Sequence, residues 1–391
     1  MKVVMTGGGS GGHITPILSV AHELKMLQPD AQIIYIGQRG DKLGDVPAED
    51  KNIDKVYTVR AGKFRRYHGE SFVKQLLDVK TIGLNIRDAF RTIAGIWQSH
   101  RLLKQLQPDV IFVKGGFVGV PVGLAAAWLR IPYVTHDSDA LPGLANRIIG
   151  RWAAKHAVAL PKEVYNYPAD KTEVVGVPVS FRFRIPTKLE LQQYRKQLGF
   201  EDFEKIMLVT GGGLGAKSLN DAVIACAAEL LQRYSGLVLV HIAGRDHEVA
   251  VRQHYKHELV LKDQKRVVVK GFVTNLYQYS AIADVVVTRA GASAIAEFAA
   301  QAKPCVVVPY SVLAGGHQLK NAVVLQERKA VRMVNDTVLA DDHKALMPAL
   351  VDLLDDSDRA RALGQKLHKM AKPDASKHLA MVLLEVSKAR N

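Results

Sequence analysis

The sequence predicts an α/β protein with two doubly wound domains, and three observations lead to this prediction. The chain has 391 residues, enough for two domains with separate cores. Short apolar runs alternate with segments of helical period, which is typical of parallel sheets with crossover helices. Each half also has a glycine-rich loop after an apolar run, Gly7–Gly12 after Val3–Met5 and Gly211–Gly215 after Ile206–Val209. Two such units predict two nucleotide-type domains that face one cleft.

The apolar runs predict the individual strands. In the first half the expected strands are Lys2–Thr6, Gln32–Ile36, Lys55–Tyr57, Val110–Val113, Tyr133–Thr135, Ala157–Leu160 and Val174–Val175. In the second half they are Lys205–Thr210, Leu237–Ile242, Val267–Lys270, Val285–Thr288, Cys305–Val308 and Val331–Val334. With a linker at Gly176–Val179, we expect an N-terminal domain over 1–177 and a C-terminal domain over 178–371. A last helix, about 372–391, is expected to cross back onto the first domain.

The charge balance predicts an anionic partner. The 53 Lys and Arg outnumber the 38 Asp and Glu, for a net charge of +15, which suits a phosphorylated substrate or an anionic lipid surface. No aromatic-basic RNA-binding module is visible, so nucleic acid is disfavoured. The sequence shows no transmembrane run and no signal peptide, and Cys226 and Cys305 have neither disulfide nor metal-ligand spacing. We therefore expect a cytoplasmic protein without a metal.

A basic stretch from Arg60 to Lys104 has two interpretations. It has ten Lys or Arg against three Asp or Glu, and five apolar residues recur in it at helical spacing: Ile82, Ile86, Phe90, Ile93 and Trp97. One interpretation is an amphipathic helix that packs this apolar stripe on the core and presents a solvated basic face. The other is a membrane-surface patch, in which Phe64, Arg65, Arg66, Tyr67 and Phe72 contact anionic head groups.

The glycine loops alone do not decide the function. Gly7, Gly9 and Gly12 satisfy the dinucleotide-binding fingerprint. A nicotinamide enzyme needs an acidic residue at the end of the second strand, and that strand ends Ile36-Gly37-Gln38-Arg39, which disfavours a dehydrogenase. In the second loop Ala216 precedes Lys217, so the Walker A pattern is not met.

His13 stands where the first glycine loop meets the following helix. A histidine with an ordinary pKa near 6.5 suits proton removal at neutral pH, so His13 is a candidate base or substrate-orienting residue. The alternative is a structural histidine that caps the loop.

Two further segments in the second half predict contacts with a nucleotide sugar. After the strand that ends at Thr288, a turn at Gly291 leads into a helix, whose N-terminus suits a diphosphate and whose Glu297 suits ribose hydroxyls. Gln318 and Asn321 follow the glycine pair Gly315-Gly316 within about one helical turn and suit sugar hydroxyls. The alternatives are a solvated first-turn Glu and a polar helix cap.

Six collinear motifs make the resemblance specific. They are GGGSGGHITP, KGGFVGVP, HDSDALPGLANR, GGGLGAKSLN, RAGASAIAEFAA and GGHQLKNA. In order and spacing they resemble the MurG family, transferases of glycosyltransferase family 28 that use UDP-N-acetylglucosamine to convert lipid I to lipid II in peptidoglycan synthesis. The resemblance spans essentially the whole chain.

The resemblance implies a GT-B architecture, with UDP-N-acetylglucosamine on the C-terminal domain and an undecaprenyl-linked acceptor on the N-terminal domain. It also implies peripheral attachment to the cytoplasmic face of the plasma membrane through the basic-apolar stretch, and cell-wall synthesis proteins as partners. The implied acceptor-side residues are Gly9, Ser10, Gly11, Gly12 and Asn146. The implied UDP-sugar residues are Gly212, Gly213, Leu214, Phe272, Val273, Arg289, Gly291, Ala292, Ser293, Glu297, Gln318 and Asn321.

The implied reaction is an inverting transfer to the 4-hydroxyl of N-acetylmuramic acid. His13, Asp137 or Asp139 would act as the base, and helix N-termini would stabilise the departing UDP, so we expect no cofactor and no metal in the chemical step.

Three departures from the family leave alternatives open. Where the family usually has His-Glu-Gln-Asn, this chain has His136-Asp137-Ser138-Asp139. Where the family usually has Gly-Gly-Ser-Gln-Gly, it has Gly211-Gly212-Gly213-Leu214-Gly215. Ser180 stands in place of the family's linker Arg. Arg182 or Arg184 would have to reach the same phosphate. A related glycolipid transferase, a UDP-N-acetylglucosamine 2-epimerase and a non-catalytic nucleotide-sugar-binding protein are the alternatives.

Overall fold

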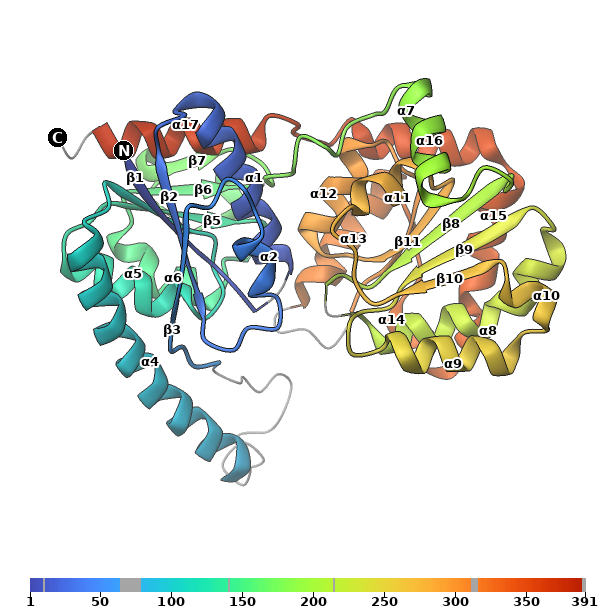
Figure 1. The fold of residues 1–391 in the computed structure, drawn as a ribbon, viewed down its shortest axis with the longest axis horizontal. Coiled ribbons are helices and arrows are strands. Elements are labelled where there is room, and N and C mark those ends of the chain that lie inside the picture. The colour runs from blue at the N-terminus through green and yellow to red at the C-terminus, as the bar shows by residue number, and fades with distance from the viewer. Residues whose placement is uncertain (10, 64–78, 140, 214, 311–315, 389–391) are drawn as a thin grey trace. The chain divides into compact units, whose positions relative to one another are not determined.

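The structure is a computed structural model that describes residues 1–9, 11–63, 79–139, 141–213, 215–310 and 316–388. It divides into two compact units, drawn in Figure 1. Unit 1 comprises Met1–Ser180 and Asp374–Asn391, and unit 2 comprises Phe181–Pro373. The chain thus passes from one unit to the other at 180/181 and returns at 373/374, where the sequence analysis set 177/178 and 371/372.

Unit 1 is built on a parallel sheet of seven strands in the order β3-β2-β1-β4-β5-β6-β7. The strands are β1 (Lys2–Thr6), β2 (Gln32–Gln38), β3 (Lys55–Val59), β4 (Val110–Val113), β5 (Tyr133–Asp137), β6 (Lys155–Val158) and β7 (Thr172–Val174). The helices are α1 (Gly11–Leu27), α2 (Asp45–Ala48), α4 (Val79–Leu106), α5 (Gly119–Trp128), α6 (Leu144–Ile149) and α17 (Ala375–Lys388).

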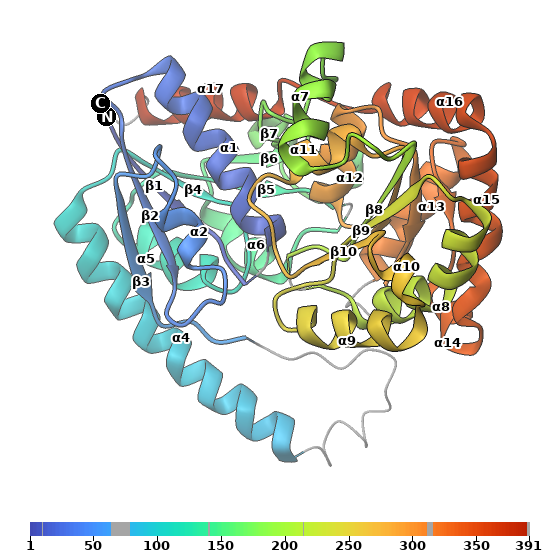
Figure 2. The same ribbon diagram turned by 45° about the vertical axis from the view of Figure 1, so that its right-hand side comes forward.

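Alternate residues of the unit 1 strands face two separate cores, as the period of a strand requires. On one face Val3 and Met5 of β1 pack with α1 and with Leu379 and Leu383 of α17. On the other face Val4 packs with residues of α4 and α5. Figure 2 shows α17 lying beside α1, so the last helix completes the core of the first unit, as expected.

Unit 2 is built on a parallel sheet of six strands in the order β10-β9-β8-β11-β12-β13. The strands are β8 (Lys205–Thr210), β9 (Leu237–Ile242), β10 (Val267–Lys270), β11 (Val285–Arg289), β12 (Cys305–Val308) and β13 (Arg332–Met333). The helices are α7 (Lys188–Leu198), α8 (Lys217–Arg233), α9 (Glu248–Glu258), α10 (Leu261–Gln264), α11 (Leu276–Ile282), α12 (Ala292–Ala300), α13 (His317–Glu327), α14 (Asp336–Asp341), α15 (Met347–Asp355) and α16 (Ser357–His368).

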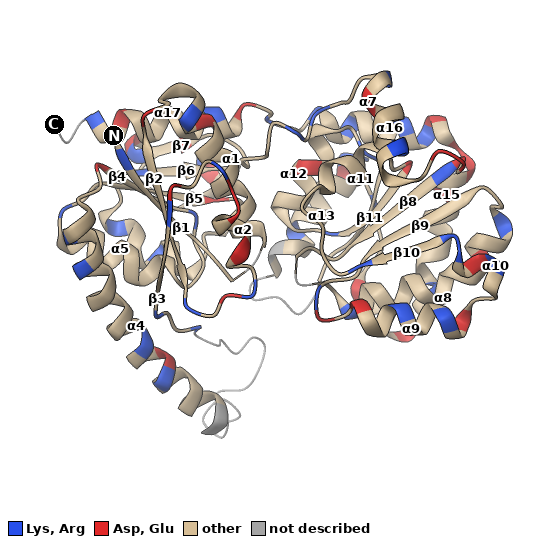
Figure 3. Cartoon of the chain, in the orientation of Figure 1, with Lys and Arg blue, Asp and Glu red and all other residues tan. Residues whose placement is uncertain are grey.

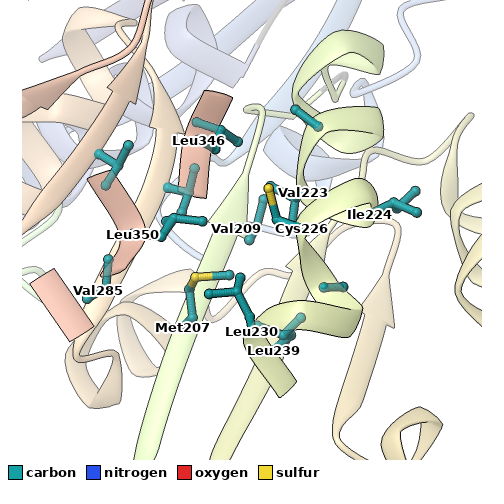
Figure 4. Packing of buried hydrophobic residues seen from close by; sticks show 14 of the residues in the cluster. Met207, Val209, Val223, Ile224, Cys226, Leu230, Leu239, Val285, Leu346 and Leu350 are labelled. Atoms are coloured by element: carbon teal, nitrogen blue, oxygen red, sulfur yellow. The ribbon is translucent and has the colours of Figure 1, made fainter. Parts of the chain in front are cut away.

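The unit 2 core repeats the arrangement of unit 1. Figure 4 shows Met207 and Val209 of β8 among apolar residues of α8, including Cys226 and Leu230, and against Leu350 of α15. The intervening residues of β8 pack on the opposite side with α11, α12 and α13. Each predicted strand is present in the two sheets, with ends shifted by up to two residues, so the predicted fold class is confirmed.

Helix α4 contradicts the interpretation that its apolar stripe packs on the core. Ile82, Ile86, Phe90, Ile93 and Trp97 are all exposed, Phe90 to 69% and Trp97 to 57%. The buried side of the helix carries the polar residues Asp88, Thr92 and Ser99, and near its C-terminal end Leu103 and Leu106. The apolar residues do recur along one side of a helix, as predicted, but that side faces outward and not toward the sheet. Periodicity alone does not show which side of a helix meets the sheet. Within the described residues no helix is long and apolar enough to cross a membrane.

Candidate functional site

The candidate acceptor site lies at the carboxyl edge of the unit 1 sheet. The strand order reverses between β1 and β4, and open α/β sheets bind ligands beside such a point. The glycine loop after β1 and the glycine pair after β4 meet here. A Cβ on Gly116, whose φ is +77°, would lie 2.6 Å from the Gly8 carbonyl oxygen. Only glycine therefore allows the two turns to touch.

His13 lies at this edge, on the first turn of α1. A Cβ built on Gly115 would lie 3.7 Å from Nε2 of His13 and 3.7 Å from Nδ2 of Asn146, so Gly115 keeps the space beside both side chains open. Burial of the ring and the charge of Lys114 lower the pKa of His13 to about 3, against a hydrogen bond with the Gly8 backbone. The imidazole is therefore neutral at pH 7, and a pKa this low makes it a weak proton acceptor in this structure.

Asp137 is held by three donors at the end of β5. Its carboxylate accepts hydrogen bonds from Nδ2 of Asn146 (3.0 Å), the Gly143 amide (3.1 Å) and the Tyr167 hydroxyl (2.9 Å). Burial raises the pKa of Asp137, and these hydrogen bonds oppose that shift. Asn146 also donates to the His136 carbonyl at 2.9 Å. Asp137 therefore orients Asn146. Because its carboxylate is already occupied by these three donors, Asp137 is a less suitable base than His13.

Sequence reasoning missed Lys114, which follows β4 directly. It is 4% exposed, and its Nζ donates to Oγ of Ser138 at 3.0 Å. Burial lowers the pKa of Lys114, and the carboxylates of Asp137 and Asp139 raise it. Lys114 stands in the quoted motif KGGFVGVP, and a lysine inside an apolar, glycine-rich run was the signal that would have singled it out. Asp139 is partly buried beside this charge, and its role as a base stays a prediction.

Asp41 is a second missed residue; it follows β2, and its carboxylate contacts the first glycine loop. Its Oδ2 accepts from the Gly9 amide at 2.8 Å, and its Oδ1 accepts from the Leu43 amide at 3.1 Å. Asp41 is two residues beyond Arg39, the last residue that the sequence analysis considered at the end of the second strand. The Gly9 amide, predicted to face the acceptor, is therefore bound to an internal carboxylate in this structure. Gly11 and Gly12 open helix α1, and the predicted Ser10 lies outside the described residues.

The candidate donor site lies at the corresponding edge of unit 2, where the strand order reverses between β8 and β11. Gly212 has φ +86° and Gly215 has φ +78°. A Cβ on Gly215 would lie 2.1 Å from the Ala243 carbonyl oxygen, so the loop approaches the turn after β9 as only glycine permits. Gly213 follows Gly212 in this turn, and the predicted Leu214 lies outside the described residues.

Arg289 ends β11 and is 6% exposed. Its guanidinium donates to Oδ1 of Asp336 at 2.6 Å, to Oγ of Ser218 at 2.5 Å and to the Val308 carbonyl at 3.2 Å. Ser218 and Asp336 were missed, and no local signal links them, because they stand 118 residues apart in the chain. The guanidinium thus ties α8, β11, β12 and α14 together, and its predicted contact with the nucleotide stays a prediction.

The other predicted donor residues gather around the carboxyl ends of β10, β11 and β12. Gly291 caps α12, so Ala292 and Ser293 lie in its first turn, and Glu297 is buried one turn further on. On α13, Oε1 of Gln318 accepts from the Tyr310 amide at 3.0 Å, and Nδ2 of Asn321 donates to the Ala290 carbonyl at 3.3 Å. Phe272 and Val273 follow β10.

Arg245, which sequence reasoning did not single out, lies after β9 with its guanidinium 4.6 Å from the centre of the Phe272 ring.

The two linker arginines have partners within their own unit. Arg184 forms an ion pair with Glu190 at 2.5 Å, and the guanidinium of Arg182 lies 5.4 Å from the centre of the Tyr277 ring. Their proposed replacement of the missing family Arg stays a prediction. Across the described ranges no three His, Cys, Asp or Glu side chains gather as a metal site would require.

Two Rossmann-like units, each with a glycine turn at its strand reversal, define the architecture of the two-domain nucleotide-sugar transferases. The N-terminal domain of glycosyltransferase family 28 matches residues 3–158, and the C-terminal domain of that family matches residues 206–379. The chain therefore belongs to glycosyltransferase family 28.

Curated relatives match along nearly the whole chain. A protein of Halothermothrix orenii is 31% identical over 99% of this chain and 100% of its own length. A protein of Geobacillus kaustophilus is 33% identical over 92% of each chain. Both are named UDP-N-acetylglucosamine–N-acetylmuramyl-(pentapeptide) pyrophosphoryl-undecaprenol N-acetylglucosamine transferase. The predicted resemblance to the MurG family is thus confirmed.

Solved structures support the fold and do not by themselves separate the alternatives. MurG of Acinetobacter baumannii has a TM-score of 0.67 at 23% identity, and the match covers 98% of this chain and 99% of that one. A UDP-GlcNAc 2-epimerase of Neisseria meningitidis, bound to UDP-GlcNAc, has a TM-score of 0.63 at 16% identity, with coverage of 98% and 100%. The curated relatives, named as transferases, favour the transferase over the epimerase.

Proposed function

We propose that this protein transfers N-acetylglucosamine from UDP-N-acetylglucosamine to the 4-hydroxyl of N-acetylmuramic acid in the undecaprenyl-linked lipid I, forming lipid II for peptidoglycan synthesis. The observation that carries this proposal is the match to transferases of that name along 99% of the chain. The position of His13 and Asn146 beside Gly115, at the carboxyl edge of the unit 1 sheet, is compatible with an acceptor site there.

In the proposed reaction His13 is the base. As the acceptor's 4-hydroxyl oxygen bonds to the anomeric carbon, the bond from that carbon to the UDP oxygen breaks, and the hydroxyl proton passes to the His13 imidazole. Attack from the face opposite UDP inverts the anomeric centre. The pKa of His13 in this structure, about 3, is too low for an effective base, so the role requires that the negative charge of the acceptor's diphosphate, bound beside the ring, raise it. Asp137 and its partner Asn146 would orient the acceptor beside it.

Unit 2 would bind the donor. The N-terminus of α12 at Gly291 would present backbone amides and the positive end of a helix dipole to the diphosphate. Glu297 in the second turn would accept hydrogen bonds from the ribose, while Gln318 and Asn321 on α13 would contact the transferred sugar. The same amides would stabilise the charge that develops on the departing UDP, which is why we propose a chemical step without a metal.

Helix α4 supports a peripheral position at the cytoplasmic face of the plasma membrane. Its exposed apolar face extends to Trp128 on α5, whose ring centre lies 5.4 Å from that of Trp97. Beside these two rings a shallow hollow is lined by Trp97, His100, Arg101, Lys104 and Gln105. Figure 3 shows Lys and Arg along α4. Amphipathic aromatic rings and basic side chains are the residue types that bind anionic membrane interfaces. The five aromatic and basic residues that the sequence analysis placed here, 64–67 and 72, lie outside the described residues.

A transfer assay with two acceptors and a control without acceptor tests the function. The purified protein is incubated with labelled UDP-N-acetylglucosamine and a lipid I analogue, a diacylglycerol acceptor or no acceptor. Label in the lipid II analogue alone supports the proposal. Label in the glycolipid would support the related transferase, and UDP-N-acetylmannosamine formed without acceptor would support the epimerase.

A further inference from the structure

Asn220 ends the motif GGGLGAKSLN, and the donor site as described gives it no role. It lies in the first turn of α8, directly after the glycine loop that follows β8, and it is 1% exposed. An asparagine inside a helix is unfavourable, and a buried amide needs hydrogen-bond partners. The partners of Asn220 therefore indicate why an amide stands at this position.

The Asn220 side chain joins α8 to β9 and to the turn after it. Its Nδ2 donates to the carbonyl oxygen of Ala243, the residue after β9, at 3.1 Å. Its Oδ1 lies 3.0 Å from Nε2 of His241, a fully buried residue of β9. Nδ1 of the same imidazole lies 2.8 Å from the hydroxyl of Tyr255 on α9. These four groups form one buried network, which we call the Asn220 network.

The Ala243 carbonyl fixes the direction of every hydrogen bond in the Asn220 network. A carbonyl oxygen only accepts, so the amide nitrogen of Asn220 must face it and the amide oxygen must face His241. The imidazole therefore carries its proton on Nε2, and its Nδ1 accepts from the Tyr255 hydroxyl. Hydrogen bonds that all run in one direction polarise one another, which favours a single arrangement of the network.

The Asn220 network ends against the glycine loop. A Cβ on Gly215 would lie 2.1 Å from the Ala243 carbonyl oxygen, so this oxygen is in close contact with the loop. The Gly215 amide donates to the Gly212 carbonyl at 2.9 Å and closes the turn. Asn220 thus holds, from the side of the core, the carbonyl against which the turn packs.

We propose that Asn220 is a positioning residue of the donor site, which fixes the Ala243 carbonyl and through it the Gly212–Gly215 turn for the diphosphate of UDP. This inference rests on the proposed function, because it assigns that turn to the donor. Glycine turns after a strand of such a sheet approach phosphates through backbone amides, and this requires a fixed turn. The proposal also accounts for three polar side chains in a layer that otherwise packs apolar residues such as Leu219 and Leu239.

Titration of UDP into the full chain tests the proposal without acceptor or turnover. Asn220→Leu fills a similar volume and removes both amide hydrogen bonds, so the Kd for UDP should rise by about 3–10-fold, the effect of one supporting hydrogen bond. Uridine has no phosphate and should bind this variant and the unaltered protein equally, as NMR titration would show. If Asn220→Leu does not fold, Asn220→Ser takes its place, because a serine hydroxyl can bond the Ala216 carbonyl one helical turn back.

Ser280→Ala is the matched control for stability. Ser280 is a buried residue of α11, on the other face of the sheet, and its Oγ lies 2.6 Å from Oε1 of Gln301. Loss of this hydroxyl leaves a buried group without its hydrogen bond and lowers the free energy of unfolding, but the Kd for UDP should stay unchanged. Equal weakening of UDP binding in Ser280→Ala and Asn220→Leu, or equal weakening of UDP and uridine in Asn220→Leu, would overturn the proposal. Unchanged UDP affinity in a folded Asn220 variant would do the same.

Hydrogen–deuterium exchange separates this inference from the proposed function. In Asn220→Leu the peptides that cover Gly212 and Gly215 should exchange faster than in the unaltered protein, whereas in Ser280→Ala they should not. Unaltered protein that binds no UDP would refute the proposed function, while the exchange still decides whether Asn220 holds the turn. UDP binding by the unaltered protein, with no change of exchange in Asn220→Leu, would refute the positioning role alone.

Discussion

Lys114 in unit 1 and Arg289 in unit 2 occupy equivalent places, yet their charges are treated differently. Lys114 follows Val113, the β4 residue paired with Thr6, and Arg289 follows Thr288, the β11 residue paired with Thr210. Each threonine leads into a glycine loop. Arg289 is bound to the Asp336 carboxylate at 2.6 Å, so its charge is cancelled on the spot. Lys114 is bound to a serine hydroxyl. The same position is thus held by a direct ion pair in unit 2, whereas in unit 1 the ammonium bonds a hydroxyl and the carboxylates of Asp137 and Asp139 act on it from nearby.

The largest effect should separate the chemical roles of the two units. His13→Ala removes the proposed base, so kcat should fall by about 10²–10⁴ with little change in the KM for UDP-N-acetylglucosamine. Glu297→Ala in unit 2 should instead raise that KM, because it removes hydrogen bonds to the ribose. Steady-state kinetics at saturating acceptor measures both. Near-normal turnover in His13→Ala would remove His13 from the role of base.

The second effect concerns stability. Asp336→Asn leaves the Arg289 charge buried without its counter-ion, and loss of one partner of a buried pair costs about 3–5 kcal/mol. Lys114→Met should cost far less, because a buried methionine needs no partner. Urea unfolding, with a probe in each unit, gives the two free energies of unfolding. Equal losses in the free energy of unfolding of the two variants would contradict the proposed difference between Arg289 and Lys114.

The third effect is the response of the two units to acid. Burial lowers the pKa of His156 in unit 1 to about 4 and that of His136 well below its ordinary value, while in unit 2 it lowers the pKa of His241 to about 3. These groups stay neutral when folded and gain a proton on unfolding below about pH 6.5. Each therefore lowers the free energy of unfolding by up to about 1.4 kcal/mol per pH unit as the pH falls from about 6.5 towards the folded value. With three such histidines, His13 included, unit 1 should lose stability more steeply than unit 2, as unfolding curves between about pH 7 and pH 5 would show.

The smallest effect concerns the surface of unit 1. Phe90→Ser on α4 should weaken binding to vesicles that contain anionic phospholipid by about tenfold or less, since one exposed aromatic ring contributes about 1–2 kcal/mol on burial. Val249→Ser, on an equally exposed position of unit 2, is the matched control. Co-sedimentation with anionic and with zwitterionic vesicles measures the change. Equal weakening by both variants would argue against α4 as the membrane face.

The sequence allowed the fold and much of the candidate site to be predicted, because both depend on local patterns. Strands such as Lys2–Thr6 are short apolar runs bounded by glycine, and His13, Asn146 and Glu297 stand inside quoted motifs. Asp41, Ser218 and Asp336 were missed because their partners lie far away in the chain. The direction of the α4 stripe was missed for a related reason. Which side of an amphipathic helix meets the sheet depends on tertiary packing, here the burial of Asp88 and Thr92.

The return of α17 to the first unit bears on the order in which the protein is assembled during synthesis. Residues 181–373 form unit 2 and are synthesised before Ala375–Lys388. Leu379 and Leu383 of that helix belong to the core around α1, so apolar surface of the N-terminal unit stays uncovered until this helix has been synthesised. The unit that is translated first is therefore the one that finishes folding last. Loss of the final fourteen-residue helix would leave that unit incomplete while the other could still fold.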